Sequence, residues 1–330
     1  SASSPHFFAF ESPLVMLVYV SQMFFTLSLG LIPVLLFHAT GTRVDRSVDL
    51  ATFFPVPLML LALLGSTGSA NCCVRGIGSV FLGNLFTQRG VLGNSVVTGN
   101  RPELFPFPLW WVISAAAVVA GSLVVRRIRA QLVSREPFRP RPDVVMLAAF
   151  GAFNIGGVIF RGVLGGPIFD RYLIPVVLAT SILLLRNTKE PTAAANRGAY
   201  LVTGLVALVS VALVSSGHSF DVARWRGGEI AASSGIPPGE VDGGFEWVGY
   251  HYRGVVQLDA PNRPLDLGPG YLDVFPRAGN CGVVAASRVS NARFDLIDSV
   301  DYRTLFGLRS HDLWIYKMMP ACENRTTEQR

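Results

Sequence analysis

Hydrophobic residues gather in six long runs along the first two thirds of the chain, and polar residues take over after residue 216. A helix needs roughly 20 apolar residues to cross the hydrocarbon core of a bilayer. Most of the runs approach this length without a charge, and the fourth contains a single one, Arg161. The pattern predicts a polytopic α-helical membrane protein with about six spans, near residues 14–37, 50–68, 109–125, 144–164, 168–185 and 199–215.

In the last third of the chain the apolar stretches are shorter, and their pattern is typical of a small α/β domain. Residues 220–234 have helical spacing, and Gly235 with the two prolines that follow it is a helix stop signal. Short apolar stretches then predict strands over 241–248, 282–286, 294–298 and 313–318. The chain is therefore expected to divide into a transmembrane domain, residues 1–216, and a small α/β domain, residues 217–330.

Composition agrees with a membrane protein, and the placement of charge predicts its orientation. Half of the residues are hydrophobic and only 15% are charged, against about a quarter in soluble domains. Three alternate connections hold eleven Lys and Arg residues, and the connections on the other side hold four. Basic loops stay in the cytoplasm. The chain is therefore expected to be a multi-pass plasma-membrane protein whose amino terminus and α/β domain lie on the extracytoplasmic side. These loops also account for the net charge of +6, so no nucleic-acid partner is expected.

The first predicted span has no basic leader and no signal-peptide pattern ahead of it. We therefore expect the chain to be a carboxy-terminal portion of a longer protein whose earlier spans are missing; the alternative is processing of a complete protein. Cys281 and Cys322 share the predicted outer domain and could form a disulfide, which an oxidising compartment permits. The sequence has no metal-binding motif of His and Cys residues, and it leaves a divalent cation open as a cofactor.

The first candidate site combines Arg161, near the outer end of the fourth span, with Asp170, Arg171 and Tyr172 at the start of the fifth. Charges at such a depth usually face a partner or a cavity. Two guanidinium groups suit a lipid-linked phosphate, because arginine binds phosphate with two hydrogen bonds. In the alternative interpretation these residues anchor the helix ends, with Asp170 paired to an arginine and Tyr172 among the lipid headgroups. Gly156 and Gly157 are expected to allow close helix packing below the site.

The second candidate site lies in the α/β domain and contains Asp242, Glu246, Trp247 and His251, with Tyr250 beside them. Aromatic rings beside carboxylates suit sugar binding, and a carboxylate can act as a base. This interpretation makes the group the acceptor side of a sugar-binding site. The alternative is that these residues only structure a strand and turn that cap the membrane part.

Two stretches carry a resemblance to a known family. The run from Pro167 to Pro175, Pro-Ile-Phe-Asp-Arg-Tyr-Leu-Ile-Pro, resembles a late-helix motif of bacterial family 39-like glycosyltransferases. These belong to the GT-C superfamily, with the protein mannosyltransferases and the aminoarabinose transferases. The run from Val241 to Trp247 resembles the outer tail of such proteins, and the resemblance covers about residues 100–260.

The resemblance implies a membrane glycosyltransferase that uses a polyprenyl-phosphate-linked sugar at the extracytoplasmic face. In that family the catalytic carboxylate lies in the first outer loop, and no such loop is found here, since Glu11 is the only acid before the first span. The resemblance therefore implies a carboxy-terminal half that binds membrane lipid and donor and whose catalytic residues are unknown. The alternative is a non-catalytic membrane protein, either a lipid-linked-sugar transporter or an assembly scaffold. The sugar, acceptor, lipid chain length and oligomeric state are left open.

Overall fold

The chain folds into two compact units. The computed structural model describes residues 13–39, 55–68, 80, 82, 88–90, 97–99, 101–133, 141–163, 170–186, 193–253, 275 and 281–318, apart from some side chains at helix ends. One unit, called here the helical unit, combines Ser1–Gln88 with Phe105–Val209. The other, called the α/β unit, combines Arg89–Leu104 with Ser210–Arg330. The α/β unit thus includes a short segment from between the second and third predicted spans.

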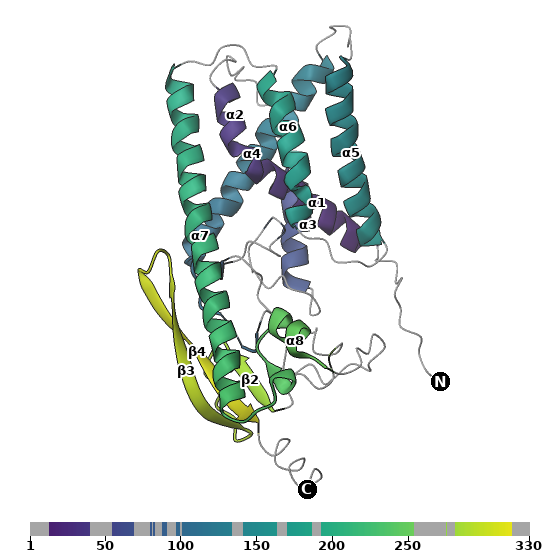
Figure 1. Cartoon of the computed structure of the whole chain (residues 1–330). Helices are drawn as coiled ribbons and strands as arrows, with labels where there is room; N and C mark the ends of the chain where they lie inside the picture. The colour runs from purple at the N-terminus through teal and green to yellow at the C-terminus, as the bar shows by residue number, and fades with distance from the viewer. Residues whose placement is uncertain are drawn as a thin grey trace, which may run out of the picture. The chain divides into compact units, whose positions relative to one another are not determined.

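Three of the described helices are long and apolar enough to cross a membrane. Their apolar parts run over Phe107–Arg129, Pro142–Val163 and Asn196–Ser233. Two further apolar stretches, Met16–Gly30 and Arg171–Leu185, are shorter. In chain order up to Ser233, the described helices are α1 (Pro13–Gly30), α2 (Ile32–Ala39), α3 (Pro55–Gly68), α4 (Phe107–Val133), α5 (Pro142–Val163), the 3₁₀ turn η2 (Asp170–Leu173), α6 (Ile174–Arg186) and α7 (Ala193–Ser233) (Figure 1).

Three of the six predicted spans thus correspond to helices that are long and apolar enough to cross a membrane, and the prediction of six is not confirmed. The first apolar run is divided into α1 and α2, which meet at Leu31. Proline lacks an N–H group and its ring clashes with the carbonyl of the preceding turn, so Pro33 explains why one continuous helix does not form. Gly30, at the end of α1, lies so close to α6 that an added Cβ would be 3.0 Å from Val177.

The long helices carry large apolar side chains that no other described part of the chain covers. Phe153 on α5 is 82% exposed, and Leu201 on α7 is also exposed. Such surfaces suit contact with lipid. Within the described part of the chain, the prediction of close helix packing at Gly156 and Gly157 is wrong, because an added Cβ at either would meet no described atom within 4 Å.

Helix α7 is one continuous helix of 41 residues, whereas the sequence predicted separate helices over 199–215 and 220–234. The intervening polar residues do not break it, and the Ser216 hydroxyl donates to the Ala212 carbonyl at 2.6 Å, inside the helix. The predicted end is confirmed. Gly235 adopts a φ of 89°, and its N–H and that of Ile236 close the last turn.

The α/β unit contains a four-stranded mixed sheet with the order β1-β2-β4-β3. Strand β1 pairs parallel to β2, and the other neighbours are antiparallel. The elements are η3 (Pro238–Glu240), β1 (Val241–Asp242), α8 (Phe245–His251), β2 (Gly282–Ala285), β3 (Phe294–Thr304) and β4 (Arg309–Met318).

The last three strands confirm the predictions, but the strand predicted over 241–248 ends at Asp242. The backbone turns there because Gly244 adopts a φ of 95° and donates its N–H to Asp242 Oδ1 at 3.1 Å. Residues 245–251 then form the short helix α8. Two adjacent glycines permit a chain reversal that a strand pattern does not reveal.

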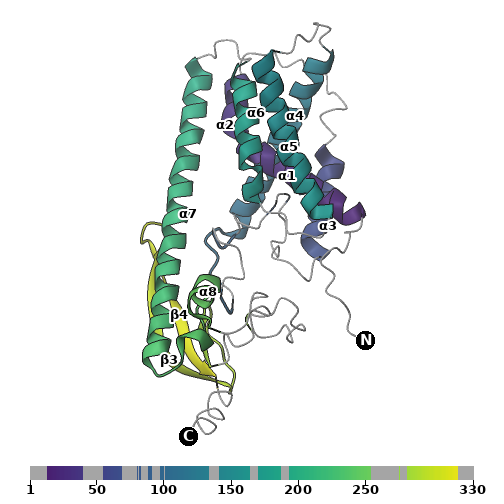
Figure 2. The same cartoon turned by 45° about the vertical axis from the view of Figure 1, so that its right-hand side comes forward.

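The carboxy-terminal half of α7 lies along the sheet and forms the core of this unit with it (Figures 1 and 2). Phe220 on α7 packs edge-on against Tyr302 on β3, with ring centroids 5.4 Å apart. Gly227 faces Val284 and Ile315 so closely that an added Cβ would lie 3.3–3.5 Å from both. The segment at Thr98 joins the sheet too, because its carbonyl accepts the Ala286 N–H at 2.8 Å.

Candidate functional site

Three residues of the first candidate site, Arg161, Arg171 and Tyr172, come together in the helical unit. Arg161 lies in the last turn of α5, and Arg171 and Tyr172 lie on η2. The Cζ atoms of Arg161 and of Arg171 each lie 5.6 Å from the centre of the Tyr172 ring. Both distances fall within the range of a cation–π interaction. Tyr172 therefore gathers two guanidinium groups that are ten positions apart in the sequence.

This arrangement rests on a small apolar core. Tyr172 packs against a cluster formed by Met23, Leu82, Val158 and Leu173, while both arginines stay exposed. Part of the ring is thus held by the core, and the charged groups remain accessible. The connection over 164–169 and the side chain of Asp170 lie outside the described part of the structure, so the predicted turn and the predicted role of Asp170 stay predictions.

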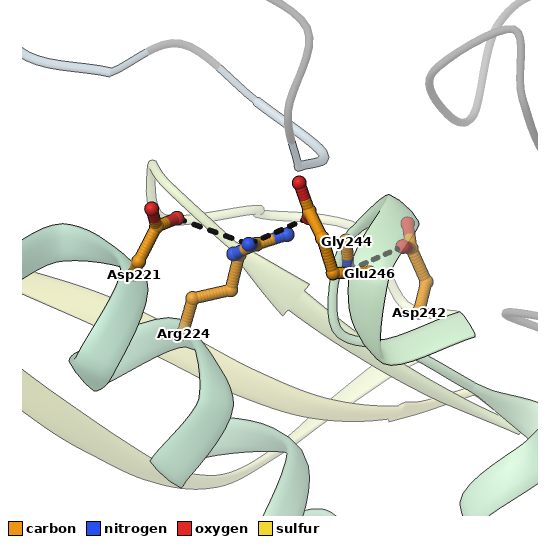
Figure 3. A network of polar contacts seen from close by, with 5 residues as sticks. All are labelled: Asp221, Arg224, Asp242, Gly244 and Glu246. Atoms are coloured by element: carbon orange, nitrogen blue, oxygen red, sulfur yellow. Dashed lines mark hydrogen bonds and ion pairs between the residues drawn. The ribbon is translucent and has the colours of Figure 1, made fainter. Parts of the chain in front are cut away.

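In the α/β unit, one buried arginine links helix α7 to helix α8 (Figure 3). Nη2 of Arg224 lies 3.0 Å from Asp221 Oδ1 and 2.7 Å from Glu246 Oε2. The Arg224 side chain is buried, whereas Glu246 is largely exposed. Charge-assisted hydrogen bonds of this length are the stronger kind. Arg224 therefore positions Glu246, which the sequence had grouped with three neighbours instead.

The pKa of Glu246 reflects this partner. Burial by itself would raise the pKa, but the positive charge of Arg224 and its hydrogen bond together lower it below the ordinary value of 4.5. Glu246 is therefore ionised at neutral pH and is engaged in an ion pair. A carboxylate of low pKa is a weak proton acceptor, so this geometry does not favour Glu246 as a general base.

Asp242 and Trp247 lie in the interior of the α/β unit. Asp242 is fully buried, accepts the Gly244 N–H, and has Thr98 Oγ1 3.5 Å from its other oxygen. Trp247 is 2% exposed and donates from Nε1 to the Pro238 carbonyl at 3.1 Å. Both residues stabilise the turn and helix α8, in line with the structural alternative.

The accessible aromatic groups near Trp247 come from both helices of the unit. Trp225 on α7 packs edge-on against Trp247, with ring centroids 5.1 Å apart. The ring of the half-buried His251 has its centroid 4.1 Å from that of Trp247. Tyr250 is 75% exposed and 4.9 Å from His251. Burial and then the nearby Arg253 lower the pKa of His251, which favours the neutral imidazole. Of the four predicted acceptor-side residues, only Glu246 and His251 are thus accessible.

Arg101 is a central residue of the α/β unit that the sequence did not single out. It is buried, and its Cζ lies 4.4 Å from the centre of the Phe220 ring. Burial lowers the pKa of Arg101. In the sequence it counted only as one basic residue in a loop, since no periodicity assigns residues 97–101 to a distant domain. A charged residue between Asn100 and Pro102 carries no local signal of burial.

Cys281, at the start of β2, is disulfide-bonded. The other three cysteines of the chain lie outside the described ranges, so the predicted pairing with Cys322 stays a prediction. Within those same ranges, no group of three His, Cys, Asp or Glu side chains is placed to hold a metal ion. A divalent cation as cofactor therefore stays an untested prediction.

Comparison of the chain with protein-family models, with curated proteins and with solved structures finds no match.

The Arg224–Glu246 pair predicts a loss of stability in acid. Because the pKa of Glu246 is lower in the folded state, the pair contributes fully above about pH 4.5 and is lost as the pH falls through the folded pKa. We expect Glu246→Gln to lower stability by about 1 kcal/mol at neutral pH and to make the acid transition shallower. Thermal unfolding followed by near-ultraviolet circular dichroism at several pH values measures this. Glu229→Gln, at an exposed position of α7, is the control, and identical acid transitions in all three proteins would contradict the prediction.

Proposed function

We propose that the chain is the donor-binding part of a GT-C-type membrane glycosyltransferase. In this proposal Arg161 and Arg171 hold the phosphate of a polyprenyl-phosphate-linked sugar at the extracytoplasmic face, and the α/β unit contributes to the acceptor side. The observation that carries the proposal is the convergence of both guanidinium groups on Tyr172.

The surroundings of the arginines support a lipid ligand. Phe160 precedes Arg161, Ile174 begins α6 just after η2, and both side chains are exposed. Two cations therefore lie beside apolar surface, an arrangement that matches a ligand with a phosphate headgroup and a hydrocarbon tail. Arginine supplies paired N–H donors in a plane that fits phosphate oxygens.

The same contacts would serve transfer of the sugar. When the glycosidic bond to the donor phosphate breaks, negative charge grows on the phosphate oxygens of the leaving polyprenyl phosphate. Guanidinium groups already placed at these oxygens stabilise that charge without reorganisation. The base that activates the acceptor is unassigned, since Glu246 is held in an ion pair and Asp242 is buried.

The binding step is tested with the purified chain in lipid nanodiscs. Native mass spectrometry would measure binding of polyprenyl phosphate and, separately, binding of the uncharged polyprenol. We expect Arg171→Ala and Arg161→Ala each to weaken binding of the phosphate by about 1.5–3 kcal/mol, roughly 10- to 150-fold in Kd. Binding of polyprenol is expected to stay unchanged, because it has no phosphate for the arginines to contact.

Arg141→Ala is the matched control. Arg141 immediately precedes α5, at the other end from Arg161, and its Nε lies 3.7 Å from Asp143. Equal phosphate binding by all the variants would overturn the donor role and favour a scaffold. In a transfer assay of the full-length enzyme with a lipid-linked sugar, Arg171→Ala is expected to abolish turnover without unfolding the protein, and normal turnover would overturn the proposed role.

A further inference from the structure

The hairpin between β3 and β4 ends in an apolar loop whose side chains point away from the core. Residues Leu305–Leu308 connect the two strands, and Phe306 and Leu308 are 54% and 83% exposed. Phe306 and Leu308 are thus large hydrophobic side chains at the tip of the β3–β4 hairpin of the α/β unit. A soluble domain gains nothing from such a tip, and exposed apolar groups of this kind mark contact surfaces.

The backbone of the loop is held in an unusual conformation. Leu305 and Phe306 have φ angles of 51° and 57°, in the left-handed region that larger side chains seldom adopt. Gly307 follows with a φ of 86°. Strain of this kind persists where the surrounding structure enforces it, and it often accompanies function. Here it presents Phe306 and Leu308 outward.

Helix α7 supplies the contact that holds the loop. The Leu305 N–H donates to Ser216 Oγ at 2.9 Å, and the Arg303 N–H donates to Ser219 Oγ at 3.1 Å. The hairpin loop therefore lies beside residues 216–219 of α7 (Figure 1). Two hydrogen bonds inside the α/β unit therefore fix the position of the hairpin loop along α7.

That position is the end of the apolar stretch of α7. Val211 and Val214, on the preceding turns, are both exposed, and the helix is apolar enough to cross a membrane. Asp221 and Arg224 follow within two turns. If α7 crosses the bilayer, residues 215–219 lie near the headgroups, and the hairpin loop lies at the same depth.

The charges along the hairpin agree with this placement. Arg303 and Arg309 lie on the two strands next to the loop and are exposed. Further from the loop, Asp301 and Asp312 are exposed and directly opposite each other. Basic groups thus flank the apolar tip and acidic groups lie farther away, which is the order that a negatively charged lipid surface favours.

We propose that the β3–β4 hairpin loop is a second membrane contact, which inserts Phe306 and Leu308 into the lipid interface beside α7 while Arg303 and Arg309 contact headgroups. The contact restrains the α/β unit at the membrane surface through two points, the helix and the hairpin. This inference depends on the membrane passage of α7 and is independent of the proposed glycosyltransferase activity.

A nitroxide spin label at position 308 tests the contact. The complete chain carrying Leu308→Cys would be placed in vesicles of phosphatidylcholine and phosphatidylglycerol, with every native cysteine that stays outside the disulfide of Cys281 replaced by serine, so that only position 308 is labelled. Power-saturation electron paramagnetic resonance then compares collision with oxygen, which enters the bilayer, and with a nickel chelate, which stays in water. The control is Leu296→Cys, at an exposed position of β3 toward the other end of the hairpin.

We expect the ratio of oxygen to nickel collisions to be several-fold higher at position 308 than at position 296. Since Leu308 is exposed, the label is not expected to disturb folding. Equal ratios at both positions, with ready access to nickel, would overturn the proposal because the loop would then lie in water. Exclusion of both reagents at position 308 would also overturn it, since the loop would then be covered by protein.

Discussion

Replacement of Gly244 by alanine is expected to destabilise the α/β unit by about 3–5 kcal/mol. Gly244 has φ 95° and ψ 166°, a region open almost only to glycine. A Cβ at this position would also overlap the guanidinium group of Arg224. The side chain of Arg224 would have to move, which separates it from Asp221 and Glu246 and leaves a buried charge poorly paired (Figure 3).

Hydrogen–deuterium exchange of the complete chain in nanodiscs measures this effect in place. The expected result is a large loss of protection in peptides from α8, β1 and β2, with little change in α4 and α5. Gly249→Ala is the matched control, because Gly249 lies in α8 and an added Cβ there would meet none of the described atoms within 4 Å. That change should leave stability equal or slightly higher, by up to about 1 kcal/mol. Similar protection in both variants would contradict the strained geometry at Gly244.

Replacement of Trp247 by alanine is expected to cost about 3–5 kcal/mol, the usual range for removal of a buried tryptophan. Its ring fills the space above two glycines, since an added Cβ at Gly228 or Gly243 would approach it to 2.7 Å. It also contacts Trp225 and donates to the Pro238 carbonyl. The variant therefore loses apolar contacts on several sides and one of two hydrogen bonds to the Pro238 carbonyl, which also accepts the Val241 N–H.

Chemical unfolding of the complete chain in detergent, followed by tryptophan fluorescence, would show a lower midpoint for Trp247→Ala. Tyr250→Ala is the control, three positions along the same helix and 75% exposed. It should change stability by less than about 1 kcal/mol. A small effect of Trp247→Ala would mean that this ring is more accessible than its burial indicates, and the sugar-binding interpretation of Trp247 would regain support.

The two candidate sites differ in what they offer a ligand. In the helical unit, two exposed guanidinium groups face one tyrosine, an arrangement that can bind an anion. In the α/β unit, the predicted acceptor group divides into a buried structural part and an accessible part. The accessible part consists of Glu246, His251 and Tyr250, so acceptor recognition, if it involves this region, would depend on these side chains.

The membrane character of this protein was determined by the sequence, because it depends on composition over about 20 residues at a time. The same holds for the end of α7 at Gly235 and for three of the four strands, whose alternation and flanking residues are local signals. The convergence of Arg161 and Arg171 was also expected, since a short connection between two helices brings their ends together.

Features that depend on contacts between distant residues were decided only by the tertiary structure. Arg101 joins the α/β unit because Phe220 covers it, and Arg224 is placed between Asp221 and Glu246 because α7 and α8 pack together. The turn at Gly243 and Gly244 replaces a predicted strand. Trp247 and Arg224 lie where the side chains of other residues at these two positions would be, so only glycine fits. Local periodicity contains no information about Phe220 beside Arg101 or Glu246 beside Arg224, because these contacts join side chains far apart in the chain. Their energy exists only once both segments have folded.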